Sequence, residues 1–357
     1  MSSNSINVLE LASTKPVLNV QELAQSGEVP KRYFRPEAEG NPVAYGDDVE
    51  LPVIDLTKLL DPELINQEEL SRLGFACREW GFFQLVNHGV PEEVIEKTKD
   101  DIMKFFKLPL KEKEAVKQLP GHLEGYGQMF VHSDEQKLDW GDALILNTQP
   151  FVIRDIRFWP ANPTTFRDTL DAYTTMIARV ADCLYRLMAK DLGVDPQVIL
   201  DSFGREQLQA VRINYYPPCK HAQKVLGLSP HSDGNALTVL LQANDVDGLQ
   251  IKKNDKWFLI KPQPRALIIN IGDAMEIMTN GKYKSIEHRA IINMEEERLS
   301  IATFHSPSID ATLCPFPGLV NAEGELYKTI SVKEYTAEYF SSKLNGKNAL
   351  ESIKLRK

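Results

Sequence analysis

Apolar residues recur at alternating steps of four and three over residues 165–192, which is the spacing of one face of an α-helix. Pro163 and Thr164 precede this stretch and Gly193 follows it, so both ends carry residues that start or stop helices. A helix of this length spans about 40 Å. We expect a long bracing helix whose apolar stripe lies against the back of a sheet.

Beyond residue 206 the pattern changes to short apolar or alternating runs, which are separated by turn residues such as Asn280-Gly281. Short strands with brief connections fit a jelly roll. We expect strands at residues 210–215, 237–242, 249–252, 257–261, 266–271, 285–292 and 300–305.

The N-terminal half mixes both patterns. Helical spacing covers residues 68–80 and 91–108, and the apolar run at 82–86 between them predicts a buried strand. A first strand is expected at 51–56, preceded by a mostly polar, loosely attached arm with a short helix near residues 20–23. The predicted fold class is mainly β with α, a jelly-roll core with an N-terminal α/β extension.

The length of 357 residues allows two domains, but we favour one large core with helical decoration. We divide the chain into an arm (1–45), an N-terminal region packed on the core (46–195), the jelly-roll core (205–310) and a C-terminal helical segment (311–357).

Composition narrows the class of protein. Hydrophobic residues make up 43% and charged residues 25%, as in ordinary soluble globular proteins. The net charge of −9 argues against nucleic acids and anionic membranes as partners. The four cysteines lie far apart, which indicates neither a disulfide framework nor a zinc site. With no signal-like start and no long apolar run, we expect a monomeric, cytoplasmic protein.

The sequence His231-Ser232-Asp233 places two metal-ligand side chains two residues apart, so both point the same way from an extended segment. His288 follows after several strands, one of which can return beside the first pair. Two imidazoles and one carboxylate with open positions suit non-haem Fe(II) that binds oxygen. Alone, the H-x-D triplet is weak evidence, because it often occurs by chance.

Two further pairs strengthen this interpretation. Strand alternation puts Arg298 and Ser300 on one face, where a guanidinium and a hydroxyl can bind a carboxylate. Asn214 and Tyr216 face one way together in the segment Asn214-Tyr215-Tyr216-Pro217-Pro218. The latter segment alone reads more simply as a strand end stopped by two prolines.

The chain closely resembles the plant 2-oxoglutarate- and Fe(II)-dependent dioxygenases. It is most similar to the specialised-metabolism branch with flavonol synthase-like enzymes, codeine and thebaine demethylases and senescence-related proteins. The resemblance runs over most of the chain. The segments that carry it are LPVIDL (51–56), ACREWGFFQLVNHGV (76–90), EGYGQ (124–128), RINYYPPC (212–219), HSD (231–233), DGLQI (247–251), NIGD (270–273), SIEHR (285–289) and RLSIATFH (298–305).

This resemblance implies the double-stranded β-helix fold and an active enzyme with Fe(II), 2-oxoglutarate and O2, and with ascorbate as reductant. It implies that His231, Asp233 and His288 are the iron ligands. Arg298 and Ser300 match positions that hold the distal carboxylate of 2-oxoglutarate, and Asn214 and Tyr216 match positions that help to seat it. No catalytic acid or base beyond the metal centre is required.

The implied reaction oxidises a small hydrophobic plant metabolite, by hydroxylation or O-demethylation, while 2-oxoglutarate becomes succinate and CO2. The identity of the compound and the carbon attacked are left open. Residues 332–350 form a candidate lid over the mouth of the core. From family position and aromatic character, the candidate substrate contacts are Tyr126, Met129, Phe130, Leu144, Arg212, Phe304 and Ser306, and core packing is the alternative for each.

Two other interpretations stay open from the sequence. One is an oxidase of the same fold that does not consume 2-oxoglutarate, because such enzymes also carry the Arg-x-Ser pair. The other is a catalytically silent, ligand-binding member of the family, although the intact metal residues argue against it.

Overall fold

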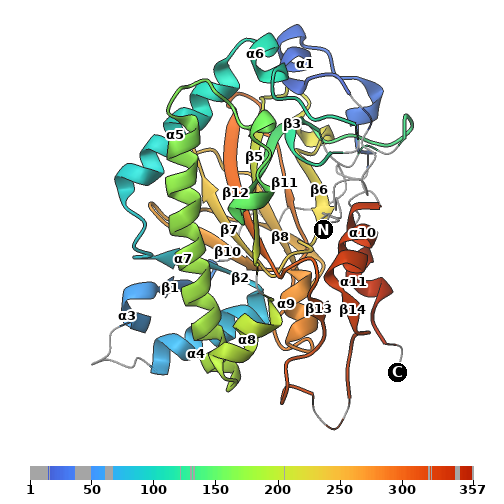
Figure 1. Cartoon of the computed structure of the whole chain (residues 1–357). Helices are drawn as coiled ribbons and strands as arrows, with labels where there is room; N and C mark the ends of the chain where they lie inside the picture. Colours follow the sequence, from blue (N-terminus) through green and yellow to red (C-terminus); the bar gives the residue numbers. More distant parts are fainter. Residues whose placement is uncertain are drawn as a thin grey trace, which may run out of the picture.

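In the computed structural model, most strands of the described residues belong to two sheets that face each other (Figure 1). Leu240 and Ile268 of the large sheet and Ile251 of the small sheet belong to one buried apolar cluster. This arrangement is the predicted jelly roll. The described residues are 15, 17–36, 50–60, 67–120, 122–128, 131, 133–204, 206–320, 322, 324–341 and 346–355.

The large sheet has the spatial order β1 (Val53–Asp55), β2 (Phe82–Val86), β10 (Leu267–Ile271), β7 (Leu237–Gln242), β12 (Arg298–Ser306), β5 (Leu208–Tyr216), β4 (Asp142–Gln149), β3 (Gly125–Gly127). The small sheet has the order β6 (Leu228–His231), β11 (His288–Ala290), β8 (Leu249–Lys253), β9 (Lys256–Leu259). A separate pair is formed by β13 (Thr312–Leu313) and β14 (Ile330–Ser331).

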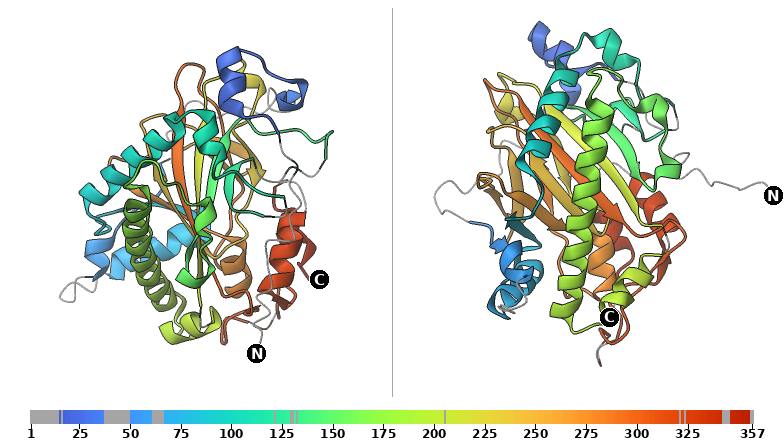
Figure 2. Two further views of the ribbon diagram at one scale, coloured as in Figure 1. Left: turned by 45° about the horizontal axis from the view of Figure 1, so that its top comes forward. Right: turned by 60° about the vertical axis from the view of Figure 1, so that its left-hand side comes forward.

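Helices cover the outer face of the large sheet. The bracing helix, α7 (Phe166–Leu192), contacts β7 and β12, as predicted, and packs beside α5 (Glu92–Lys107) (Figures 1 and 2). None of the helices in the described part of the chain has the length and apolar character needed to cross a membrane. The remaining α-helices are α1 (Val20–Ser26), α3 (Leu56–Leu60), α4 (Gln67–Phe75), α6 (Leu110–Glu114), α8 (Pro196–Ser202), α9 (Asp273–Met278), α10 (Val332–Ser341) and α11 (Asn348–Ser352).

Strand alternation gives the large sheet an apolar outer face, whereas its inner face carries polar residues beside an apolar cluster. On β12, Leu299 and Ile301 join the core cluster beneath the helices. Arg298 and Ser300 alternate with them and therefore face the interior between the sheets. The chemistry-bearing residues of β5 and β12 thus lie on the inner face.

The N-terminal arm is not loosely attached where it is described. Val20 is fully buried in a cluster that also contains Trp140 and Tyr216. The backbone N–H groups of Val20 and Gln21 donate to the buried Asp142 carboxylate, both at 3.0 Å. The expectation of a loose arm was wrong because a few apolar residues and one buried carboxylate anchor an otherwise polar stretch.

Several element boundaries also differ from the predictions. The first strand covers only Val53–Asp55, because Leu56 already begins α3, and β11 covers three residues instead of the eight expected at 285–292. The strand β4 and the helix α9 were not predicted. The other helices and strands of the prediction are present within a few residues of their expected ends.

Candidate metal centre and adjoining polar pocket

Three buried side chains converge at one end of the jelly roll. His231 ends β6 and pairs directly with His288, the first residue of β11, while Asp233 follows in the loop after β6. The Nε2 atoms of His231 and His288 lie 3.5 and 3.6 Å from Asp233 Oδ1. One ligand atom from each residue lies within 4.8 Å of the others, which is close enough to hold one metal ion.

Hydrogen bonds to the main chain fix both imidazoles. His231 Nδ1 lies 2.8 Å from the Ser229 carbonyl oxygen, and His288 Nδ1 lies 3.1 Å from that of Ile286. A carbonyl oxygen only accepts, so each Nδ1 carries the proton and each Nε2 keeps a lone pair. Phe82 packs edge-on against the His288 ring, with centroids 5.3 Å apart. Both rings therefore present a donor nitrogen to the same point.

The Asp233 carboxylate is oriented by two neighbours that the sequence analysis did not identify. Its Oδ2 accepts hydrogen bonds from Thr238 Oγ1 at 2.6 Å and from Asn270 Nδ2 at 2.7 Å. This leaves Oδ1 turned toward the imidazoles. Asn270 lies in the quoted NIGD segment, whereas nothing in the sequence around Thr238 distinguishes it from an ordinary strand residue.

The charges of the triad suit a divalent cation. Burial raises the pKa of the Asp233 carboxyl, but His288, His231 and Thr238 together outweigh burial, so that its pKa lies well below the usual range. Burial, and the nearby His231, lower the pKa of His288 to about 4. A charged carboxylate and an unprotonated imidazole, the forms that bind metal, are therefore favoured at neutral pH.

A second group of polar side chains lies on the inner face of β5 and β12. Arg298 pairs with Tyr216 and Ser300 pairs with Asn214 across these strands, and Asn214 Nδ2 donates to Ser300 Oγ at 3.4 Å. Arg298 is only 2% exposed, and its guanidinium lies 5.4 Å from the Tyr216 ring centre. Gly248 makes room for it, because a Cβ there would lie 2.6 Å from Arg298 Cδ. The structure brings all four predicted residues together.

Several polar atoms in this group lack a partner among the described residues. Arg298 Nε, Asn214 Oδ1 and Gln242 Oε1 are all buried without a hydrogen bond. Gln242 pairs with Ser300 from the neighbouring strand β7. Because unpaired buried polar atoms are costly, this group fits a polar ligand with a carboxylate better than an empty apolar core.

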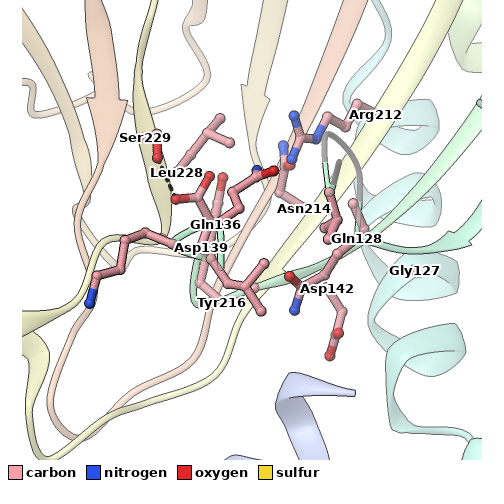
Figure 3. A pocket seen from close by; sticks show the side chains of 16 residues that line it. Gly127, Gln128, Gln136, Asp139, Asp142, Arg212, Asn214, Tyr216, Leu228 and Ser229 are labelled. Atoms are coloured by element: carbon pink, nitrogen blue, oxygen red, sulfur yellow. Dashed lines mark hydrogen bonds between the residues drawn. The ribbon is translucent and has the colours of Figure 1, made fainter. Parts of the chain in front are cut away.

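A pocket adjoins this group (Figure 3). Its walls come from Gly127, Gln128, Val131 and residues 136–139 and 141–143, from the inner face of β5 and from the start of β6. Gln128, Asp139, Arg212 and Ser229 are among the side chains around it, and Ser229 Oγ donates to Asp139 at 2.6 Å. The pocket is thus lined largely by hydrogen-bonding groups.

The predicted substrate contacts are placed on different sides of the sheet. Arg212 lines the pocket, with a buried Nε that has no partner among the described residues. Phe304 and Ser306 lie on the same face of β12 as Ser300. By contrast, Tyr126 and Leu144 pair with each other and belong to the core beneath the helices.

Tyr126 and Leu144 point to the outer face of the large sheet, because side chains alternate between the two faces of a strand. Tyr126 contacts Phe105 and Phe106 of α5, and its hydroxyl is hydrogen bonded to Asn19. Neither Tyr126 nor Leu144 lines the pocket, so core packing, the alternative considered from the sequence, describes their position. Met129 and Phe130 lie outside the described residues.

The fold and the triad define a non-haem metal oxygenase. Two family models match the chain, the 2OG-Fe(II) oxygenase superfamily over residues 207–307 and the N-terminal region of non-haem dioxygenases in morphine synthesis over residues 51–162. The chain belongs to the 2-oxoglutarate- and Fe(II)-dependent oxygenase superfamily and resembles its plant members throughout its length. It is therefore an enzyme that uses Fe(II), 2-oxoglutarate and O2, with ascorbate as the usual reductant of the class.

Similar proteins cover nearly the whole chain. The 2-oxoglutarate-dependent dioxygenase 11 of Oryza sativa subsp. japonica is 49% identical over 95% of this chain and 97% of its own length. The codeine O-demethylase of Papaver somniferum is 41% identical over 98% of this chain and 99% of its own length. Among solved structures, the crystal structure of JOX2 in complex with 2OG, Fe and JA matches with a TM-score of 0.88, covering 96% of this chain and 99% of that chain. The two sequences are 35% identical.

Proposed function

We propose that His231, Asp233 and His288 hold the Fe(II) of this dioxygenase. The observation that carries this proposal is their convergence, with ligand atoms within 4.8 Å of one another and both Nε2 atoms facing Asp233 Oδ1. Two neutral nitrogens and one carboxylate oxygen are the donor set that suits non-haem Fe(II) and leaves coordination positions open. The residues present therefore fit the metal.

We further propose that Arg298 and Ser300 bind the distal carboxylate of 2-oxoglutarate, with Asn214 and Tyr216 beside it. A buried guanidinium favours an anion, and its unpartnered Nε can donate one more hydrogen bond. Ser300 lies on the same face of β12 as Phe304, which pairs with Thr238, the residue that holds Asp233. One ligand can thus extend along this inner face from Arg298 toward the metal ligands.

When bound, Fe(II) and 2-oxoglutarate would supply the oxidation of a substrate C–H bond with O2 as the oxidant, coupled to the oxidative decarboxylation of 2-oxoglutarate to succinate and CO2. The chain's own residues orient these groups. Thr238 and Asn270 hold the Asp233 carboxylate, and Arg298 offsets the charge of the cosubstrate. The buried apolar cluster between the sheets, which includes Leu240, keeps water from the site.

We propose that the pocket in Figure 3 receives a small plant metabolite, which is hydroxylated or O-demethylated there. Arg212 is the proposed polar contact, because its buried Nε is available to an acceptor on the substrate. Phe304 and Ser306, on the inner face of β12, are the proposed contacts near the metal ligands. The O-demethylases among the similar proteins support demethylation as one outcome.

The division into an arm, an N-terminal region, a core and a C-terminal segment, the monomeric state and the cytoplasmic location remain proposals. The net charge of −9 supports the proposal that nucleic acid is not a partner.

A metabolite screen tests the proposed function. Purified protein, Fe(II), ascorbate and 2-oxoglutarate are incubated with extract fractions, and succinate release is measured with the gain of an oxygen atom or the loss of a methylene unit. Succinate formed in step with product excludes the oxidase that does not consume 2-oxoglutarate. Persistent absence of substrate-dependent O2 uptake across the fractions would favour the silent ligand-binding member.

A further inference from the structure

The segment that carries two metal ligands is held by residues from the far C-terminal part of the chain. Gly346 forms a parallel bridge with His231. The Gly346 N–H donates to the Pro230 carbonyl oxygen at 2.8 Å, and the Ser232 N–H donates to the Gly346 carbonyl oxygen at 3.2 Å. The C-terminal chain therefore continues the strand pairing of β6 at the point where the ligands begin.

Helix α10 reaches the same segment with two tyrosines, Tyr339 directly and Tyr335 through Asp273. The Tyr339 hydroxyl donates to the Ser232 carbonyl oxygen at 2.9 Å. Its ring lies against Gly234, where a Cβ would come within 2.9 Å of Tyr339 Cδ2. The Tyr335 hydroxyl donates to Asp273 Oδ2 at 2.8 Å. Both tyrosines thus lie next to the loop between the sheets that holds Asp233.

Asp273 links Tyr335 to the metal segment. Asp273 Oδ2 also accepts from Ser232 Oγ at 3.0 Å, and the Asp273 N–H donates to the Asp233 carbonyl oxygen at 2.7 Å. Ser232, Asp273 and Tyr335 are each only 1–2% exposed. The N–H, the carbonyl oxygen and the hydroxyl of Ser232 therefore all have partners, either in the C-terminal segment or in Asp273, which the C-terminal segment holds.

These bonds hold the two peptide groups that lie between the metal ligands. Ser232 lies between His231 and Asp233, so the orientation of its peptide groups sets the directions of both ligand side chains. A site with three protein ligands depends on such supporting contacts, and their loss typically lowers metal affinity by about 10- to 100-fold. The C-terminal contacts reach the backbone of the segment 231–233, whereas Thr238 and Asn270 reach the Asp233 side chain.

We propose that Tyr335 and Tyr339 are positioning residues of the metal centre, which act through Asp273 and Ser232 to hold His231 and Asp233 in binding geometry. This inference rests on the proposed ligand set. It gives α10 a role that operates before any substrate binds, in contrast to the lid suggested by the sequence of residues 332–350.

The test compares Tyr335→Phe and Tyr339→Phe with a matched control, Tyr327→Phe. Tyr327, like Tyr335, is 2% exposed. Its hydroxyl donates at 2.6 Å to Glu276, the second buried carboxylate of α9. The control removes an equivalent hydrogen bond to a carboxylate that contacts Lys347 of the C-terminal segment but no group of Ser232. Metal affinity is measured by anaerobic titration with Fe(II) and, independently, with Co(II), whose absorption spectrum reports the ligand geometry. Thermal unfolding of each apoprotein records stability.

We expect Tyr335→Phe and Tyr339→Phe each to weaken Fe(II) binding about 10-fold and to alter the Co(II) spectrum. Tyr327→Phe should lower the melting temperature by a similar amount and leave both metal readouts unchanged. Ser232→Ala removes the other bond to Asp273, so its effect should not add to that of Tyr335→Phe. Ser232→Ala also serves if a tyrosine variant does not fold.

Equal metal affinities for Tyr335→Phe, Tyr339→Phe, Ser232→Ala and Tyr327→Phe would overturn the inference, as would fully additive effects of Ser232→Ala and Tyr335→Phe. A failure of the proposed function gives a different result. In that case the wild-type chain binds neither Fe(II) nor Co(II), or it binds them as well after His231→Ala.

Discussion

The Thr238 hydroxyl offers a direct test of how the metal ligand Asp233 is held. Thr238→Val keeps the shape of the side chain and removes one of the two donors to Asp233 Oδ2, while Asn270 remains. The 2.6 Å distance to a buried carboxylate indicates a strong, charge-assisted bond. Without it, only Asn270 holds Oδ2, and the carboxylate can turn more easily away from the imidazoles.

A hydrogen bond to a charged group contributes about 1.5–3 kcal/mol. If most of this energy serves to orient Asp233, the dissociation constant for Fe(II) should rise about 10- to 100-fold, since about 1.4 kcal/mol corresponds to a factor of ten. Anaerobic calorimetric titration of the apoprotein with Fe(II) measures this constant directly. Addition of 2-oxoglutarate after the metal shows whether the second ligand still binds.

Thr98→Val is the matched control. Thr98 is equally buried, and its hydroxyl bonds the Val94 carbonyl oxygen within α5, on the far side of the large sheet. We expect the control to change stability but not metal affinity. A dissociation constant for Thr238→Val within twofold of wild type, with the control behaving as expected, would refute the account of how Asp233 is oriented.

Two further changes test other parts of the structure. Burial lowers the pKa of His305 to about 3, whereas an unfolded histidine titrates near pH 6.5, so the unfolded state binds more protons between these values and stability falls as the pH falls. The free energy of unfolding of the wild type, measured in urea, should fall by about 2 kcal/mol more than that of His305→Asn between pH 7.5 and pH 5. If the two free energies changed in parallel with pH, the burial of His305 would be contradicted. Gly248→Ala should displace the Arg298 side chain, and we expect about tenfold weaker 2-oxoglutarate binding with unchanged Fe(II) affinity. If a titration shows that the affinities for both ligands are unchanged, Arg298 does not need this space.

The sequence predicted those features that repeat or that have a strict spacing. The 3.6-residue periodicity located α7, and the two-residue spacing of His231 and Asp233 indicated that both point the same way. The same alternation of side chains along a strand placed Arg298 and Ser300 on one face. Such features depend on local geometry, which a sequence expresses directly.

The remaining features depend on which elements pack together. All six residues of α9 are buried, so this helix has no solvent-exposed face that periodicity could reveal. Thr238 lies in the run LTVLLQ, which reads only as a buried strand. Tyr126 and Leu144 lie in adjacent strands whose inward face could not be chosen from the sequence, because a shift of one residue exchanges the two faces.

The most direct test measures succinate and CO2 from 2-oxoglutarate with the purified enzyme, Fe(II), O2, ascorbate and a metabolite fraction that is active in the screen, in the wild type and in His231→Ala. We expect the wild type to form both products in equal amounts, and His231→Ala to form neither while it unfolds at nearly the same temperature as the wild-type apoprotein. Unchanged succinate formation by a folded His231→Ala variant would contradict the assignment of the metal centre.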